Sequence, residues 1–301
     1  MRGPATGSGA GLRWVAALVL AGVSLAAQAI SYVAPMDKAE WRLELSPFAC
    51  RMWQPIPVYG DAVFEALAGE QQRFYLDPVR NPMREGKASL ITTAPAWDPQ
   101  RPTTDMGYVP VRGPGERPVE LDSRGANQLL DQLYQGMGLV FTRRAWYSAT
   151  ERIQVGMSPV NFRRAYAQYR GCLADLLPIS FDEVARTRVH FQTAKWTLTP
   201  AAREKLDLVV RFAKADPSIS GFFVDGHTDS VGRKLYNLEL SQKRAETVTK
   251  YLIANGVDGA RITTRYHGER YPVAPNNSVD NRASNRRVTI RLERDGIAYA
   301  D

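Results

Sequence analysis

The clearest pattern of apolar and polar positions lies in the last third of the chain. An apolar run over residues 219–224 has the length of one buried strand and stops before Gly226. A helical pattern starts near Asn237 or Glu239 and continues to about Asn255. Its apolar face is formed by four side chains at helical spacing, namely Leu238, Ala245, Val248 and Leu252. The pattern therefore predicts a strand, a polar loop and a long helix, in that order.

The segments around this unit extend the pattern in both directions. A strand is predicted at residues 188–191, and a helix capped by Thr199 follows it. Further strands are predicted at residues 262–266 and 287–292, and the second of these alternates apolar and polar side chains. The polar loop 268–284 is expected to form one wall of a cleft. The order is β-α-β-α-β with a final hairpin-like strand, which predicts a β-α-β-α-β-β sandwich.

The first half of the chain follows a different pattern, with short runs punctuated by glycine, proline and aspartate. Five such runs are predicted as strands: residues 41–45, 73–76, 88–92, 139–142 and 153–155. Two helices are predicted at residues 126–136 and 161–173, the second with Ser158 as its cap and Pro159 in its first turn. Residues 30–180 are therefore expected to form a mostly antiparallel β domain with one or two helices. The whole chain is predicted to be of the α+β class.

Residues 1–29 have the features of an export signal. Arg2 and Arg13 supply positive charge, and residues 14–26 are apolar. Residues 27–29, Ala-Gln-Ala, fit the small-x-small pattern of a signal-peptide cleavage site. These features predict a cleaved signal peptide and a location in the periplasm. An uncleaved anchor helix is the alternative that the residues leave open.

The cysteine count adds a covalent constraint. Cys50 and Cys172 are the only cysteines in the sequence, and both lie in residues 30–180. An exported protein meets an oxidising compartment, so an even count predicts a disulfide between them. Two buried free thiols are the alternative. The three histidines show no metal-ligand spacing, so neither a metal nor a cofactor is expected, and His227 is expected to pack or to form hydrogen bonds.

Charge and missing motifs restrict the class of partner. The formal net charge is +8 and the isoelectric point about 9.5, so the surface suits an anionic partner. The sequence has no nucleic-acid-binding motif, so no nucleic acid is expected. It has no Gly-x-Ser-x-Gly, His-Glu-x-x-His or cysteine–histidine arrangement typical of an enzyme, and the spacing of Asp225 and Asp229 says little about an acid–base pair. Peptidoglycan, whose stem peptides carry carboxylates, fits the charge.

One pair of opposite charges lies beside the predicted strand and helix. Asp229 lies on the loop at the strand's end, and Arg244 lies inside the helix. A carboxylate that faces a guanidinium forms a clamp for a ligand with both an ammonium and a carboxylate, because arginine binds a carboxylate through two parallel hydrogen bonds. A structural ion pair between Asp229 and Arg244 is the alternative.

A series of motifs in the last third follows the order and spacing of a known family. The motifs are Thr228-Asp229, Gly232, Asn237, Leu240-Ser241, Arg244-Ala245, Val248, Leu252, Gly256, Gly268, Pro272, Asn276-Asn277 and Asn285-Arg286-Arg287-Val288. Over about residues 183–294 they resemble the OmpA-like C-terminal domain, which binds peptidoglycan. The resemblance implies that Asp229 holds the ammonium of diaminopimelate in a stem peptide and that Arg244 holds a carboxylate of the same group. It also implies four further residues that line the pocket: Thr228, Asn237, Leu240 and Arg287.

Motifs near the start of the chain carry a second resemblance. They are Trp41-Arg42, Cys50-Arg51, the segment 55–60 (Pro-Ile-Pro-Val-Tyr-Gly), Ala62-Val63-Phe64 and Ala68-Gly69-Glu70. These motifs resemble the MotY family of periplasmic proteins in polar-flagellar motors.

The MotY resemblance implies a non-enzymatic component of the T ring of the motor. Residues 30–180 would attach to the flagellar basal body together with a MotX-like partner. Residues 181–294 would bind peptidoglycan, so that the protein helps to hold the stator units, and residues 295–301 would form a tail. A generic OmpA- or Pal-type cell-wall anchor without a flagellar role is the alternative. A stator protein would need a membrane helix with an ion-carrying acid, and the apolar segment 14–26 has none.

Overall fold

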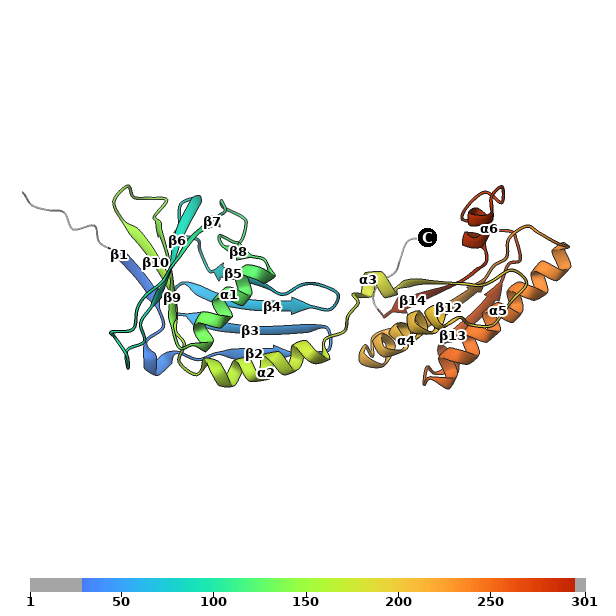
Figure 1. Cartoon of the computed structure of the whole chain (residues 1–301), viewed down its shortest axis with the longest axis horizontal. Coiled ribbons are helices and arrows are strands. Elements are labelled where there is room, and N and C mark those ends of the chain that lie inside the picture. The colour runs from blue at the N-terminus through green and yellow to red at the C-terminus, as the bar shows by residue number, and fades with distance from the viewer. Residues whose placement is uncertain (1–28, 296–301) are drawn as a thin grey trace, which may run out of the picture.

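Two hydrophobic cores, one in each half of the chain, organise the computed structural model, which describes residues 29–295. Figure 1 shows the two halves side by side, with the short helix α3 (Phe181–Val184) where they meet. The predicted signal peptide lies outside the described residues except for Ala29, and the tail beyond Asp295 lies outside them as well. Within residues 29–295 no helix has the length and the apolar character needed to cross a membrane.

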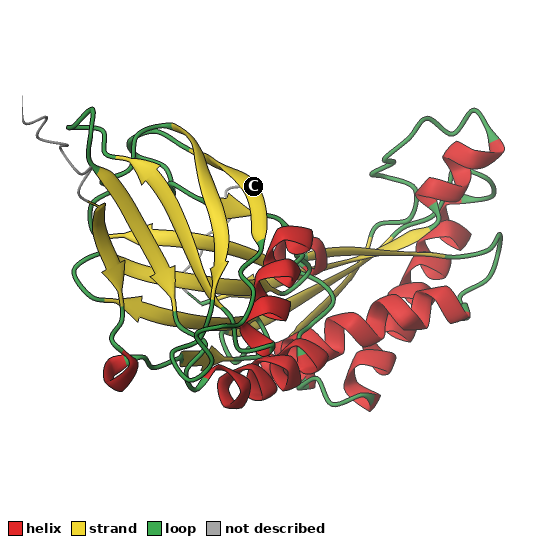
Figure 2. Cartoon of the chain, turned by 60° about the vertical axis from the view of Figure 1, so that its left-hand side comes forward, coloured by secondary structure: helices red, strands yellow, loops and turns green. Residues whose placement is uncertain are grey.

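The N-terminal half consists of two five-stranded sheets on either side of the first core (Figure 2). One sheet has the order β1 (Ala29–Val33), β10 (Arg152–Met157), β9 (Gly138–Arg144), β6 (Gly86–Thr93) and β7 (Asp105–Val111). The other has the order β2 (Arg42–Leu45), β3 (Ala49–Ile56), β4 (Gly60–Leu67), β5 (Arg73–Pro78) and β8 (Glu120–Leu121). In the described residues of this half, only β1 and β10 pair in parallel, and the rings of Phe74 and Phe141 stack between the sheets. The predicted antiparallel β domain is confirmed.

Two helices complete this half, α1 (Ser123–Tyr134) and α2 (Phe162–Asp175), and both were expected from the sequence pattern. The predicted cap of the second helix is wrong, because Ser158 and Pro159 precede α2. The N-cap position is Asn161, with a left-handed φ of 61° and no capping hydrogen bond from its side chain. The carbonyl oxygen of Ser158 instead accepts a hydrogen bond of 3.0 Å from the side chain of Gln54.

The C-terminal half is a four-stranded sheet with two long helices on one face. The strand order is β11 (Arg186–His190), β14 (Arg287–Arg294), β12 (Ile219–Gly226) and β13 (Ile262–Tyr266). The covering helices α4 (Pro200–Ala215) and α5 (Lys234–Ala254) contribute apolar residues to the second core. Thr199 caps α4 as predicted, since its hydroxyl accepts from the backbone N–H of Ala202. The expected α+β class is therefore found in both halves.

The last strand of the C-terminal half departs from the predicted hairpin. β14 lies between β11 and β12 and runs antiparallel to both, so it does not pair with the preceding strand β13. The predicted polar loop also contains a short helix, α6 (Val279–Asn285). The alternation along β14 is confirmed, because Val288, Ile290 and Leu292 are fully buried against the helices. The residues between them therefore face away from the helices, on the open face of the sheet.

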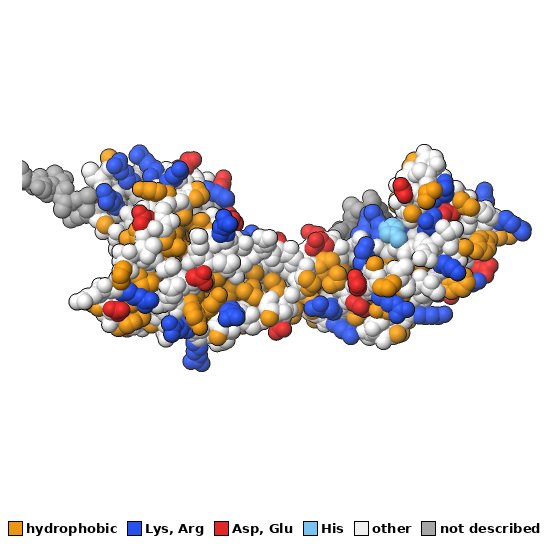
Figure 3. Space-filling view, in the orientation of Figure 1, with side chains coloured by type: hydrophobic (Ala, Val, Ile, Leu, Met, Phe, Trp, Pro, Cys, Tyr) orange, Lys and Arg blue, Asp and Glu red, His pale blue; other side chains and the backbone are white. Residues whose placement is uncertain are grey.

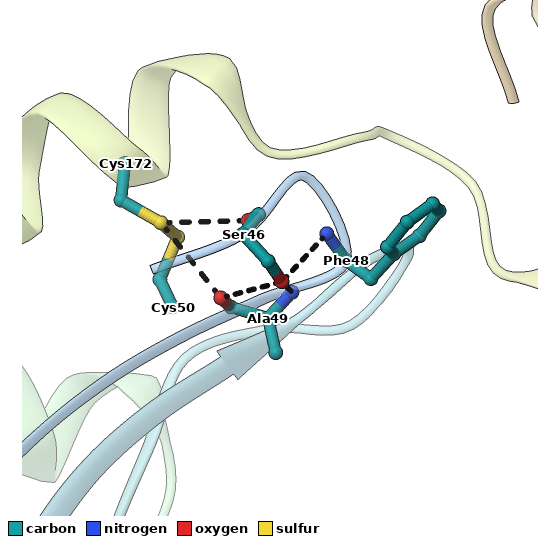
Figure 4. The surroundings of a disulfide bond; sticks show 5 residues. All are labelled: Ser46, Phe48, Ala49, Cys50 and Cys172. Atoms are coloured by element: carbon teal, nitrogen blue, oxygen red, sulfur yellow. Dashed lines mark hydrogen bonds between the residues drawn. A yellow bond between two sulfur atoms is a disulfide. The ribbon is translucent and has the colours of Figure 1, made fainter. Parts of the chain in front are cut away.

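The two halves are joined at a short, well-connected segment. Leu177 donates its backbone N–H to Pro47 and accepts at its carbonyl from Gly69, so two turns of the N-terminal half hold the linker. The predicted disulfide between Cys50 and Cys172 is confirmed, and it fastens the end of α2 to β3 next to this linker (Figure 4). A ring from each half then meets at 5.2 Å, Phe48 of the β2–β3 turn and Phe212 of α4.

Candidate functional site

The residues predicted from the sequence to bind a ligand converge on the C-terminal end of β12. The strand end packs closely on α5, because a Cβ at Gly226 would lie 2.2 Å from the carbonyl oxygen of Ser241. Loop 227–233 leads from the strand into the helix. All six predicted side chains are buried around this loop: Thr228, Asp229, Asn237, Leu240, Arg244 and Arg287. The fold therefore brings the predicted residues into one region.

Arg244 is a fully buried side chain, and its guanidinium binds three backbone carbonyl oxygens. Nε donates to Lys195 at 2.9 Å, Nη1 to His227 at 3.0 Å and Nη2 to Gln192 at 3.1 Å. Burial lowers the pKa of Arg244 to about 10, and the nearby Asp229 opposes this shift. Arg244 is still protonated at neutral pH, and it fixes the loop before α4 to the end of β12.

Asp229 pairs with Arg286 rather than with Arg244. Arg286 Nη1 donates to Asp229 Oδ2 at 2.9 Å, and the backbone N–H of Val231 donates to Oδ1 at 3.1 Å. The side chains of Arg286 and Asp229 are only 13% and 9% exposed. Among the residues that the structure describes, no hydrogen bond joins Asp229 to Arg244. Beyond the effect of burial, Asp229 raises and Arg286 lowers the pKa of Arg244, so the three charges form one interacting cluster.

The neighbouring polar residues shape the loop. Asn237 Nδ2 donates to the carbonyl oxygen of Asp229 at 3.3 Å and to Glu269 Oε2 at 2.7 Å. The backbone N–H of Thr228 donates to Gly268 at 2.9 Å, but the buried hydroxyl of Thr228 has no hydrogen-bond partner within residues 29–295. Asn237 therefore holds the loop in place, and the hydroxyl of Thr228 is available to a bound group.

Arg287 lies on the open face of the sheet, and its guanidinium donates to the carbonyl oxygen of Tyr271 at 3.1 Å. Next to it, the rings of His227 and His267 stack with centroids 5.0 Å apart. His267 Nε2 lies 2.8 Å from Asp225 Oδ1. The sequence separates these histidines, but the end of the sheet brings them together. In the described part of the chain, no group of three or more histidine, cysteine, aspartate or glutamate residues is placed to hold a metal ion.

The ionisation of this second cluster follows from burial. Burial lowers the pKa of His227 to about 4, and the nearby Arg287 adds to the effect. Burial opposes ionisation of Asp225, but hydrogen bonds from Arg265 and His267 outweigh it and lower the pKa of this carboxyl group. Asp225 binds Arg265 and Asp229 binds Arg286, so the two carboxylates belong to separate ion pairs.

Sequence reasoning missed Arg286 as a site residue, although it stands in the quoted motif beside Arg287. Successive side chains of a strand point to opposite faces. Val288 is buried against the helices, so Arg287 must point to the open face. Arg286, one residue earlier, is then the arginine that can turn toward Asp229. This alternation was visible in the sequence.

Each half of the chain matches a known protein family. Residues 32–178 match the family model described as the MotY N-terminal domain, and residues 190–286 match the OmpA family. The sodium-type flagellar protein MotY of Vibrio parahaemolyticus is 30% identical over 283 residues, which cover 92% of this chain and 94% of that protein. Outer membrane protein A of Bordetella avium is 37% identical over 115 residues, which cover 38% of this chain and 59% of that protein.

Two solved structures resemble part of the chain. The C-terminal domain of Helicobacter pylori MotB is 27% identical and covers 36% of this chain and 86% of its own, with a TM-score of 0.35. The peptidoglycan-associated lipoprotein from Burkholderia pseudomallei is 29% identical and covers 35% and 89%, with a TM-score of 0.34. The Vibrio relative, in contrast, matches along nearly the whole length of both proteins, and the chain therefore belongs to the MotY family.

Proposed function

We propose that this protein is a non-enzymatic component of the flagellar motor that binds peptidoglycan through its C-terminal half. The family membership supports the flagellar role, and the OmpA match over residues 190–286 supports wall binding. The observation that carries the proposal is the buried charge cluster of Asp229, Arg244 and Arg286 at the end of β12. Buried charges are costly unless they are paired, so a cluster with an excess of positive charge suits an anionic group of a ligand.

The chemistry of the cluster suits the diaminopimelate of a stem peptide, which carries an ammonium and a carboxylate on one carbon. In this proposal the ammonium binds Asp229 in place of Arg286, and the carboxylate binds Arg244. Three of the five N–H groups of Arg244 are used by backbone carbonyls, which leaves two for a ligand. The displaced Arg286 can bind the same carboxylate, so that both arginines share the negative charge of the ligand while Asp229 pairs with its ammonium.

The other predicted residues have supporting parts in the proposal. Thr228 offers its unpartnered hydroxyl to the ligand, and Leu240 supplies an apolar wall. Asn237 holds the loop that carries Asp229. Arg287 supports the segment around Tyr271 from the open face of the sheet.

The N-terminal half has the second part of the proposed role. Residues 30–180 attach to the flagellar basal body with a MotX-like partner as part of the T ring, and residues 181–294 hold the wall, which keeps the stator units in position. The match of residues 32–178 to the MotY N-terminal domain supports this division and disfavours a generic OmpA- or Pal-type anchor. A cleaved signal peptide and a periplasmic location belong to the same proposal.

The test combines motility, localisation and wall binding. Cells that lack the protein should assemble flagella but swim poorly, and the full chain should restore swimming and collect at the flagellated pole. The purified full chain should sediment with purified peptidoglycan sacculi. Normal swimming of the deletion strain would refute the motor role, and a chain that stays in the supernatant would refute the wall role.

A further inference from the structure

The open face of the C-terminal sheet carries a basic groove that shares only Arg287 with the proposed wall site. Figure 3 shows histidine and positively charged side chains close together on this half of the molecule. The groove has a volume of about 1070 Å³. Its charged and aromatic lining comes from all four strands and the segment after β13: Arg186, Arg188, Asp225, His227, Arg265, His267, Tyr271, Arg287 and Arg291.

The strand register sets the positive charges side by side. Arg186 on β11 is directly opposite Arg291 on β14. Like charges directly opposite each other on antiparallel strands are destabilising. Beyond the effect of burial, the positive charge of Arg188 lowers the pKa of Arg287, because the two guanidinium groups repel each other. The groove therefore carries a local electrostatic cost that an anion would relieve.

The acidic lining does not balance this charge. Asp225 is the only acidic side chain that lines the groove in the described residues, and it is bound by Arg265 and His267. Arg186 and Arg188 are exposed, and within residues 29–295 neither guanidinium forms an ion pair or a side-chain hydrogen bond. Five arginines thus surround one lining carboxylate that is already engaged, and Glu293 beside the groove pairs with Arg291 at 3.9 Å.

The floor of the groove contains buried polar atoms that form no hydrogen bond within the described residues. His227 and Arg287 are 6% and 5% exposed. His227 Nδ1 and Arg287 Nε have no hydrogen-bond partner in the part of the chain that the structure describes. Buried polar atoms are normally satisfied, so a ligand at the floor would complete them. These atoms distinguish a formed site from a merely charged surface.

The groove also offers apolar contacts between its charges. Tyr271 and Val273 on the rim are 60% and 52% exposed. Two of the lining arginines, Arg265 and Arg291, also lie over the ring of Phe223, with 4.9 Å and 4.8 Å between guanidinium and ring centroid. Arginine and tyrosine are enriched at protein interfaces, where a partner buries apolar side chains as well as charges. This mixture favours an acidic polypeptide over a phosphate polymer or a lipid surface.

The groove and the proposed wall site lie back to back. The carbonyl oxygen of His227 accepts from Arg244 on the helix side, whereas the ring of His227 lines the groove. We propose that the open face of the sheet is a docking site for an acidic, aromatic-containing segment of a protein partner. Because the two sites use opposite sides of β12, the partner binds while the wall site is occupied.

The first experiment measures binding of a fluorescent random copolymer of glutamate and tyrosine to the full chain by anisotropy. Binding should weaken as salt is raised, because the contacts are electrostatic. The double variant Arg186→Glu/Arg188→Glu should lose affinity by about tenfold or more. The matched control Arg203→Glu/Arg211→Glu makes the same charge change on exposed positions of α4, and it should leave the affinity within about twofold. An equal loss in both double variants would overturn the proposal.

The second experiment separates this proposal from the wall proposal. The Arg186→Glu/Arg188→Glu variant should sediment with sacculi like the unchanged protein, and Asp229→Asn should bind the copolymer normally. If the groove variant no longer sediments with sacculi and the copolymer does not bind even the unchanged protein, the groove belongs to the wall site and the proposal of a protein partner is refuted. If the unchanged protein binds phosphatidylglycerol vesicles but not the copolymer, and the groove variant does not bind the vesicles, the groove binds a membrane surface and the proposal of a protein partner is refuted. Failure of Asp229→Asn to affect sacculi would refute the clamp alone.

Discussion

The charged side chains at the end of β12 differ in what they contribute to ligand binding and to the stability of the fold. Asp229 accepts a hydrogen bond at Oδ1 from the backbone N–H of Val231 and at Oδ2 from Arg286. The backbone contact fixes the orientation of the carboxylate, and a ligand ammonium can replace Arg286. Arg244 has no exposed surface, and three carbonyl oxygens depend on it. A change at Asp229 therefore tests ligand binding, whereas a change at Arg244 tests binding and folding together.

Asp229→Asn should reduce sacculus binding by thirtyfold to several thousandfold, because loss of one partner of a buried charge pair costs about 2–5 kcal/mol. The amide keeps the size of the carboxylate and its contact with Val231, so the circular dichroism spectrum should not change. Asp280→Asn is the control, since it removes an exposed carboxylate on α6. A folded Asp229→Asn protein that sediments with sacculi normally would refute the clamp.

Arg244→Ala should lower the free energy of unfolding by about 3 kcal/mol or more, because it leaves three buried carbonyl oxygens without a donor. Arg244→Lys should recover part of this loss and less of the wall binding, since an ammonium cannot form the paired hydrogen bonds of a guanidinium. Urea unfolding measures the first effect and sacculus sedimentation the second. Unchanged stability of Arg244→Ala would contradict the hydrogen bonds described for this side chain.

His227 should make stability depend on pH. Its pKa is lowered to about 4 in the folded protein, so between the unfolded value of about 6.5 and about 4 the unfolded state binds more protons. Stability is therefore highest above that window and falls as pH drops through it, by about 2 kcal/mol between about pH 7.5 and about pH 5. Urea unfolding of His227→Gln should show a smaller fall over this range. An equal fall in wild type and His227→Gln would contradict burial of the neutral ring.

At the scale of helices and strands, the sequence was most informative where one period dominates. The long helix α5, the capped helix α4 and the alternating strand β14 were all predicted, because apolar residues recur at the period of each element. The strands β3 and β4 were not predicted. β3 alternates buried and partly buried residues but contains Pro55, and β4 is buried along most of its length, so neither showed a clean period.

The order of strands in the C-terminal sheet could not be predicted from the pattern of apolar and polar residues. The apolar residues of β14 show that one of its faces is buried, but they do not identify its neighbours, so insertion between β11 and β12 was not expected. The same limit applies to the site. The motif contained Arg286, but only the three-dimensional arrangement shows that it reaches Asp229 across 57 residues of sequence.

The disulfide should be the main covalent support of the N-terminal half. It links β3 to α2 across a sequence separation of 122 residues. Its removal in Cys50→Ala/Cys172→Ala should lower the free energy of unfolding by at most about 4–5 kcal/mol, as the loss of a long closed loop in the unfolded chain predicts. Peptide mass mapping without reductant should find the two cysteine peptides joined. Free thiols in the protein isolated from its native compartment would contradict the pairing.

At the scale of the whole molecule, the two halves depend on a small junction. Ala68 of the N-terminal half belongs to the core of the C-terminal half, and Phe48 packs on Phe212 there. The linker between α2 and α3 is held by backbone hydrogen bonds to Pro47 and from Gly69. If the N-terminal half is fixed to the basal body and the other half to the wall, as proposed, force between them must pass through this junction.

Phe48→Ala should therefore uncouple the halves without unfolding either one. Truncation removes the ring that packs on Phe212, and large-to-small changes at such contacts cost about 2 kcal/mol or more, although the partial exposure of Phe48 lowers the figure. Limited proteolysis should cut the linker at residues 176–180 several-fold faster than in the unchanged protein. Val79→Ala, at an exposed position of the same half, should not change the cleavage rate. A linker that is equally resistant in Phe48→Ala would show that the hydrogen bonds around Leu177 hold the junction without the aromatic contact.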